Sequence, residues 1–145
     1  MIFRGKYVTL QDVSRPYITI EVKSVTDAWI ALPFLIDTGA DATFLDHSCL
    51  QQLGLDASFE AMQTTVSGVG GSTPYMEFST QLRLRSETRE NKIFVGAIGI
   101  FTDPAASDTP VLGRDVLDAF KTIIDYERNQ ILLLSPPHDY RVMAR

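Results

Sequence analysis

The strongest pattern in the chain is an alternation of apolar and polar side chains over residues 75–85. Met76, Phe78, Leu82 and Leu84 all lie at even-numbered positions, and a period of two places them on one face of a β-strand. Such a strand is stable only in a sheet that covers its apolar face and leaves the other face in water. The chain therefore has to build a β-sheet with one hydrated side.

Shorter patterns add further strands and little helix. Two more strands are expected at 18–22, which alternates, and at 28–36, where Pro33 suggests a bulge or an edge. The apolar run 93–101 predicts a buried strand, closely approached by another backbone at its two glycines. The remaining expectations are short helices at 47–53, with Asp46 as N-cap and Gly54 as stop, and at 115–120, and a hairpin of 122–126 with 130–134.

Composition limits the partners and the compartment. The 145 residues suit one domain, and 18 acidic against 13 basic residues give a net charge of −5, which opposes binding to nucleic acid or anionic membranes. A single cysteine, Cys49, excludes an internal disulfide and is expected to be a small buried helix residue. Neither a signal peptide nor a membrane span is visible, so a cytoplasmic location is expected. No motif predicts a metal site or a cofactor.

Three segments stand out once common catalytic motifs are excluded. They are FLIDTGADATFLD at 34–46, SGVGGST at 67–73 and PVLGRDVLDAF at 110–120. In the first segment, Asp37 lies between an apolar strand and a tight Thr-Gly turn. We expect this position to leave its carboxylate partly desolvated. The second has no lysine after its glycines and runs into a strand, so it is no phosphate-binding loop.

Together these segments resemble the retropepsin-like aspartic peptidases, which include retroviral and retrotransposon proteases, eukaryotic Ddi-type proteins and bacterial relatives. The resemblance spans 17–134, with 1–16 as an N-terminal extension and 135–145 as a tail. It implies an all-β fold, a small closed β-barrel of the retropepsin type with one or two short helices and a flap hairpin. It also implies an aspartic endopeptidase that acts on peptide or protein substrates without a cofactor or metal.

The resemblance assigns roles to individual positions. It implies a catalytic loop whose reacting carboxylate belongs to Asp37, with Thr38 fixing the loop and Gly39 permitting close backbone approach. Structural support is expected from Gly113 and Arg114, the latter paired with a partly buried Asp41. The positions expected to bind substrate are Ala40, Asp41, Gly68, Val69, Gly70 and Gly71.

Amide hydrolysis of this kind needs two carboxylates that share one proton, and the chain supplies only one suitable turn. Asp108-Thr109-Pro110 fails as the second, because proline removes an N–H that the turn needs. The expectation is therefore a homodimer in which Asp37 of each chain meets its copy at a two-fold axis. An apolar interface that involves the segments IIDY and ILLL near the C-terminus is expected as well.

Other interpretations of the same residues stay open. A catalytically inactive module that dimerises or binds extended peptides could share this scaffold. The glycines at 68–71 could form a plain hairpin turn instead of a mobile flap. Asp41 and Arg114 could be two unrelated surface charges.

Overall fold

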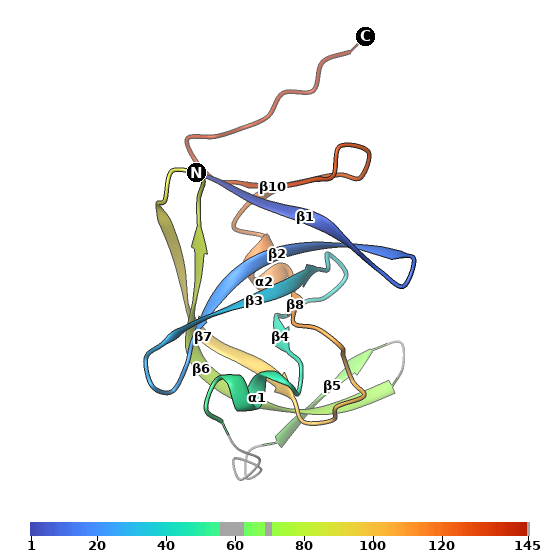
Figure 1. Cartoon of the computed structure of the whole chain (residues 1–145), viewed down its shortest axis with the longest axis vertical. Helices are drawn as coiled ribbons and strands as arrows, with labels where there is room; N and C mark the ends of the chain where they lie inside the picture. Colours follow the sequence, from blue (N-terminus) through green and yellow to red (C-terminus); the bar gives the residue numbers. More distant parts are fainter. Residues whose placement is uncertain (56–62, 69–70, 145) are drawn as a thin grey trace.

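The fold is described by a computed structural model over residues 1–55, 63–68 and 71–144, with side chains outside 63–68 (Figure 1). This part of the chain forms ten strands and two helices of one turn each. The strands are β1 (Ile2–Leu10), β2 (Val13–Lys23), β3 (Trp29–Ile36), β4 (Phe44–Leu45), β5 (Gln63–Gly68), β6 (Gly71–Arg85), β7 (Asn91–Phe101), β8 (Val111–Leu112), β9 (Lys121–Asp125) and β10 (Gln130–Leu134), and the helices are α1 (Cys49–Gln52) and α2 (Arg114–Leu117).

The strands belong to one sheet in the order β5-β6-β7-β4-β8-β3-β2-β1-β10-β9. A further pairing of β6 with β2, through Leu82 opposite Val22 and Arg83 opposite Glu21, links strands that are distant in this order. The pairings therefore run in a ring through β2, β3, β8, β4, β7 and β6. The expected all-β architecture with short helices is confirmed.

The core is built by strands of this ring together with β1, β10 and the two helices, and it follows the alternation seen in the sequence. Ile18, Ile20 and Val22 of β2 are at most 3% exposed, as the pattern at 18–22 predicts. On β6, Met76, Leu82 and Leu84 are likewise buried. Pro33 lies on a locally open edge, since β8 pairs only with Leu35 and Ile36 of β3. A proline there removes no ladder hydrogen bond, as expected of an edge position.

The expectation of a buried strand at 93–101 is wrong for its first half. Ile93 and Val95 of β7 are 48% and 76% exposed, and burial begins at Ile98. The reason is that β4, the neighbour of β7 opposite β6, pairs only with Gly99 and Ile100. The expected close approach of another backbone is wrong at both glycines: a Cβ at Gly99 would overlap the side-chain ring of Phe44, and a Cβ at Gly96 would meet open space.

The helices form where short helices were expected but are shorter. Gly54, with φ +75°, follows α1 as its predicted stop. Asp46 is not the N-cap, which is Ser48; instead its carboxylate accepts hydrogen bonds from the amide and hydroxyl of Ser48 and from Cys49 Sγ. Cys49 is buried, and burial raises the pKa of its thiol to about 12. The thiol is therefore a structural residue.

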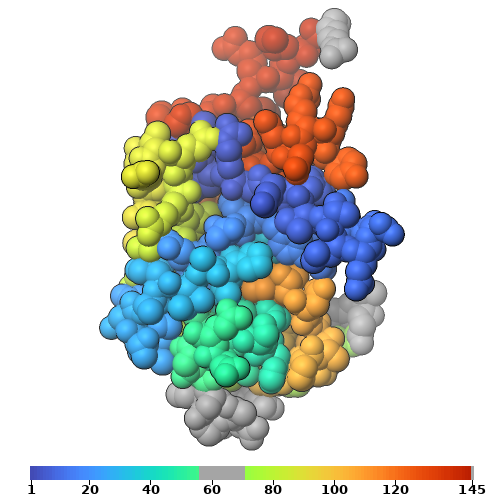
Figure 2. Space-filling model, in the orientation of Figure 1, coloured from blue at the N-terminus to red at the C-terminus, as the bar shows by residue number. Residues whose placement is uncertain are grey.

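Residues 1–16 form β1 and the start of β2. β1 pairs with β2 and β10, and Phe3, 1% exposed, packs edge-on against Phe120 with ring centroids 5.4 Å apart. The predicted C-terminal hairpin is confirmed as β9 and β10. Beyond it, residues 136–144 are exposed: Asp139 forms an ion pair with Lys121 of β9, and the end of the segment extends away from the body (Figure 2). No helix in the described ranges is long and apolar enough to cross a membrane.

One ion-pair cluster joins β2 to β6 at the pairing that completes the ring. Glu21 accepts hydrogen bonds from Arg83 Nε at 2.7 Å and Arg85 Nε at 2.9 Å, and its side chain is 20% exposed. The Arg83 guanidinium also lies 4.1 Å from the centroid of the Trp29 ring. These hydrogen bonds, led by that from Arg83, lower the pKa of Glu21 to about 2. The ionised form is thus stabilised by folding.

We predict that Glu21→Gln lowers the free energy of unfolding at pH 7 by about 2 kcal/mol. The folded pKa of Glu21 lies below its ordinary value of 4.5, so its contribution is complete above that pH and is lost as the pH falls toward 2. Urea unfolding of both proteins across this range measures the difference. The exposed Glu77→Gln is the matched control, and a Glu21→Gln deficit that does not change with pH would contradict the assignment.

Candidate functional site

The turn that follows Asp37 is held by a hydrogen bond to the Asp37 carboxylate. Asp37 directly follows β3, in which buried and more exposed residues alternate, and its Oδ1 accepts a hydrogen bond from the Gly39 amide at 2.9 Å. A Cβ at Gly39 would lie 3.3 Å from that oxygen, so glycine lets the amide approach without crowding. Within the described residues no hydrogen bond is made by the other oxygen, Oδ2. The side chain is half-buried, while Thr38 next to it is exposed.

Backbone hydrogen bonds hold this loop against the segment 112–115. The Asp37 amide donates to Leu112 O at 3.1 Å, and the Arg114 amide donates to Ala40 O at 2.9 Å. Gly113 lies directly on the backbone of Ala42, where a Cβ would overlap main-chain atoms. Its φ of −94° suits any residue, so glycine is needed here for its small volume. The two conspicuous sequence segments therefore meet as one unit.

A buried threonine completes this unit, and sequence reasoning did not identify it. Thr43 is 1% exposed; its hydroxyl donates to Asp115 Oδ1 at 2.6 Å and accepts the Gly113 amide at 3.1 Å. The Thr43 amide donates to Asp115 Oδ2 at 3.0 Å. The one feature of the sequence that could have indicated a buried hydrogen bond is the position of Thr43, a polar residue between the apolar Ala42 and Phe44. Asp115 therefore positions the loop through Thr43.

Asp41 and Arg114 form the expected ion pair through Asp41 Oδ1 and Arg114 Nη2. The expected partial burial is wrong for the single chain, since the two side chains are 86% and 53% exposed. An exposed pair contributes little to stability because water screens it. The Asp41 carboxylate is therefore accessible to solvent on the outer side of the loop. Ala40 is half-buried beside it.

β5 and β6 form the hairpin where the flap was expected, and it projects from the body (Figure 1). Gly68 pairs with Gly71, whose φ of +105° favours glycine. Val69 and Gly70, at the expected tip, lie outside the described residues. Whether this hairpin moves over a substrate stays a prediction.

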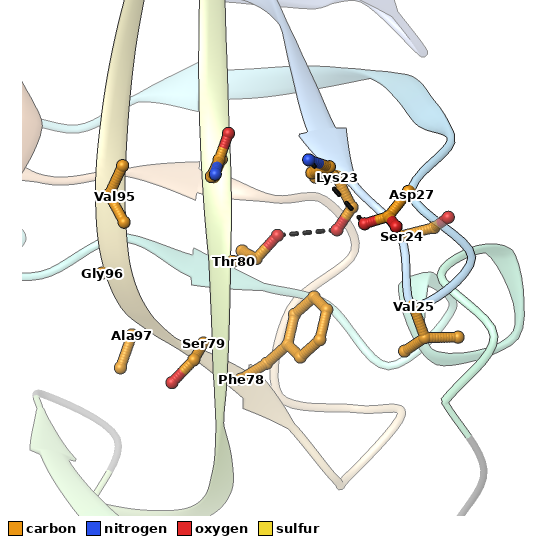
Figure 3. A pocket seen from close by; sticks show the side chains of 11 residues that line it. Lys23, Ser24, Val25, Asp27, Phe78, Ser79, Thr80, Val95, Gly96 and Ala97 are labelled. Carbon is orange, nitrogen blue, oxygen red and sulfur yellow. Dashed lines mark hydrogen bonds and ion pairs between the residues drawn. The ribbon is translucent and has the colours of Figure 1, made fainter.

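A hollow lies elsewhere, between the β2–β3 turn and strands β6 and β7 (Figure 3). It has a volume of about 570 Å³ and includes Thr80, whose hydroxyl donates to Lys23 O, and Asp27, which pairs with Lys23. No residue of the loop 37–43 lines it. Across the described ranges, no group of three or more His, Cys, Asp or Glu side chains could hold a metal ion.

We predict that Thr43→Val lowers the free energy of unfolding by about 1–3 kcal/mol. Valine has nearly the same shape but leaves the Gly113 amide and Asp115 Oδ1 without their partner. Thr43→Ser, which keeps the hydroxyl, should recover much of the loss in urea unfolding. The exposed Thr19→Val on β2 is the control; equal stability of Thr43→Val and the native protein would contradict the anchoring role.

Comparison with known proteins agrees with this geometry. A family model described as "Aspartyl protease" matches residues 24–116. The chain is similar to the crystal structure of a retropepsin-like aspartic protease from Rickettsia conorii, with a TM-score of 0.57, 20% identity and coverage of 92% of this chain and 97% of that one.

The EIAV protease complexed with the inhibitor HBY-793 also matches, with a TM-score of 0.47, 24% identity and coverage of 77% of this chain and 92% of that one. No curated protein matches. The family model spans well over half of the chain and includes both the Asp37 turn and the 112–115 segment. The chain therefore belongs to the aspartyl protease family and has the retropepsin-like fold.

Proposed function

We propose that this protein is a homodimeric aspartic endopeptidase in which Asp37 of each chain supplies half of the catalytic pair. The observation that carries the proposal is the Asp37 turn: a half-buried carboxylate directly after strand β3, with one oxygen held by the Gly39 amide. Family membership supports a peptidase. The exposed Thr38 is proposed to fix the loop across the dimer axis.

The need for a second chain follows from the other acids near the loop. Asp41 is paired with Arg114, and both carboxylate oxygens of Asp115 accept hydrogen bonds from Thr43. Neither carboxylate is placed to share a proton with Asp37. An isologous contact between two chains brings a residue at the axis next to its own copy. Symmetry therefore offers a partner that the single chain lacks.

The proposed chemistry needs no covalent intermediate. Two adjacent carboxylates cannot both ionise, so they hold one proton between them, as aspartic protease pairs do. The ionised carboxylate takes a proton from water as the oxygen attacks the peptide carbonyl. The protonated one gives its proton to the carbonyl oxygen, which yields a tetrahedral diol. The C–N bond then breaks as its nitrogen takes the proton that came from water, and the other carboxylate takes back a hydroxyl proton, so that a carboxylic acid, an amine and a pair with one proton remain. Activity is therefore expected at mildly acidic pH, where the pair carries one proton.

The substrate is proposed to be a peptide in extended conformation, bound between the loop and the β5–β6 hairpin. Such a segment can add backbone hydrogen bonds as a strand does, while its side chains alternate between pockets. Ala40, Asp41 and the glycines 68, 70 and 71 are proposed to contact it, with Val69 at the hairpin tip. The cytoplasmic location expected from the sequence stays a prediction.

We predict that Asp37→Asn lowers peptide cleavage at least about a hundredfold and leaves the fold intact. The control is Asp103→Asn, because Asp103 Oδ1 accepts the Ala105 amide at 2.9 Å in the same kind of turn. Cleavage of a mixed peptide library across a pH series, read by mass spectrometry, measures the effect. Full activity of Asp37→Asn would refute the catalytic assignment. Peptide binding without cleavage by the native protein would identify a non-catalytic module.

The dimer surface is proposed to include β9. The segment ILLL is internal to the chain, since β10 pairs with both β1 and β9 and Ile131 and Leu133 are fully buried. β9 pairs with β10 alone among the described strands, and Ile124 on β9 and Tyr126 directly after it are 43% and 67% exposed. An apolar contact is needed because each chain carries a net charge of −5.

We predict that Ile124→Glu converts the dimer to a monomer, because it places a carboxylate from each chain in an apolar contact. Ile93→Glu is the matched control, since Ile93 is 48% exposed on β7. Sedimentation equilibrium at micromolar concentrations distinguishes the two. A native protein that sediments as a monomer would contradict the dimer, and dissociation by Ile93→Glu alone would place the interface on β7 instead.

A further inference from the structure

Strand β7 has an open edge along most of its length. From Asn91 to Ile98 it pairs with β6 alone among the described strands, because β4 pairs only with Gly99 and Ile100. An edge of this kind presents backbone N–H and C=O groups that no neighbouring strand satisfies. Residues 95–97 are exposed. The edge is therefore accessible to a further strand.

Two hollows meet along this edge. The larger, of about 570 Å³, includes Ser79 and Gln81 of β6, and the smaller, of about 130 Å³, includes Phe94 of β7 and Val116 of α2. Residues 95–97 line both of them. Figure 3 shows these three residues on the β7 side of the larger hollow. A strand added along the edge thus finds space for side chains on each of its two faces.

The side chains beside the edge define what such a strand contacts. Ile93, Val95 and Ala97 share one face of β7, and the first two are 48% and 76% exposed. On the other face, Phe94 is half-buried and a Cβ at Gly96 would meet open space. Side chains directly opposite one another in a sheet are in contact. The first face therefore suits apolar side chains at every second position, and the small hollow admits a side chain of moderate size.

The charge on the edge is positive. Lys92 is the one charged residue from Asn91 to Ile98, in a chain whose net charge is −5. Its Nζ lies 5.2 Å from the centroid of the Phe120 ring and 6.0 Å from that of Phe94, and no carboxylate in the described ranges forms an ion pair with it. Charge complementarity therefore favours a segment that carries an acidic residue near Lys92.

We propose that the β7 edge is a docking site for an extended segment of a partner protein, with apolar side chains at alternate positions and a carboxylate beside Lys92. The segment adds a strand next to the part of β7 that β4 leaves unpaired. In this mode of binding, backbone hydrogen bonds supply affinity and side-chain positions supply selectivity. No residue of the loop 37–43 lines either hollow, so docking here is separate from the proposed cleavage.

The probe is an acetylated peptide of about nine residues in which valine alternates with threonine between two terminal glutamates. It is added to the full chain carrying Asp37→Asn, which is expected not to cleave it. Fluorescence anisotropy at micromolar protein concentration measures the affinity, and hydrogen exchange locates the amides that the peptide protects. A second probe is methylated at its internal amide nitrogens, so those nitrogens cannot donate hydrogen bonds to β7.

Two further substitutions in this protein test the edge. Val95→Glu is expected to weaken binding at least about tenfold, because it places a carboxylate in the apolar contact and repels the acidic probe. Lys92→Gln is expected to weaken it about two- to fivefold through loss of an exposed ion pair. The matched control is Val13→Glu, since Val13 is 56% exposed on β2, and it should leave the affinity unchanged.

Docking at the edge should protect amides within 91–98, and the methylated probe should not bind. Protection of the loop 37–43 instead, with equal affinity after Val95→Glu, would overturn the docking site and support the proposed substrate site. Absence of probe binding, or equal binding of the methylated probe, would overturn docking by strand addition. Sedimentation of the protein without probe as a larger species that Val95→Glu disperses would assign the edge to a second copy of this chain and overturn the inference.

Discussion

The arrangement of the candidate site depends on the buried hydroxyl of Thr43. It joins the end of the Asp37 loop to Gly113 and Asp115, two residues that open α2. A short loop with an exposed outer side has few apolar contacts to hold it, so directional hydrogen bonds define its shape. With its start bonded to Leu112 and its end bonded to Asp115, the loop has little freedom between them.

The two strands next to this loop, β3 and β8, each divide their side chains between two faces. On β3, Leu35 lies half-buried on the outward face, Ile36 faces the core, and Asp37 follows the strand. On β8, Val111 is half-buried and Leu112 is buried in the same way. Because these strands pair with each other, packing of the core also fixes the position of Asp37 relative to the half-buried Leu35 and Val111.

The elements that the sequence predicts well are those with local signals. The alternation at 18–22, the C-terminal hairpin and the stop at Gly54 depend on neighbouring residues, and all appear in the structure. The exposure of Val95 was not predicted because it depends on how many residues of β7 pair with β4, a strand that is distant in sequence. Thr43 was missed for the same reason: its partner Asp115 is 72 residues away. The turn at Asp37 was predictable, since the turn and the strand before it are contiguous in the sequence.

The free side of β7 has a consequence for the behaviour of the protein in concentrated solution. From Asn91 to Ile98 this strand pairs with β6 only, among the described strands, and Ile93 and Val95 are exposed on it. An apolar strand with an open edge is a template for pairing with another chain, and charge along the edge is the usual protection. Lys92 is the only charged residue between Asn91 and Ile98. Unfavourable association at high concentration should therefore start at this edge, and a lysine in place of Val95 would be the natural means of keeping the protein dispersed.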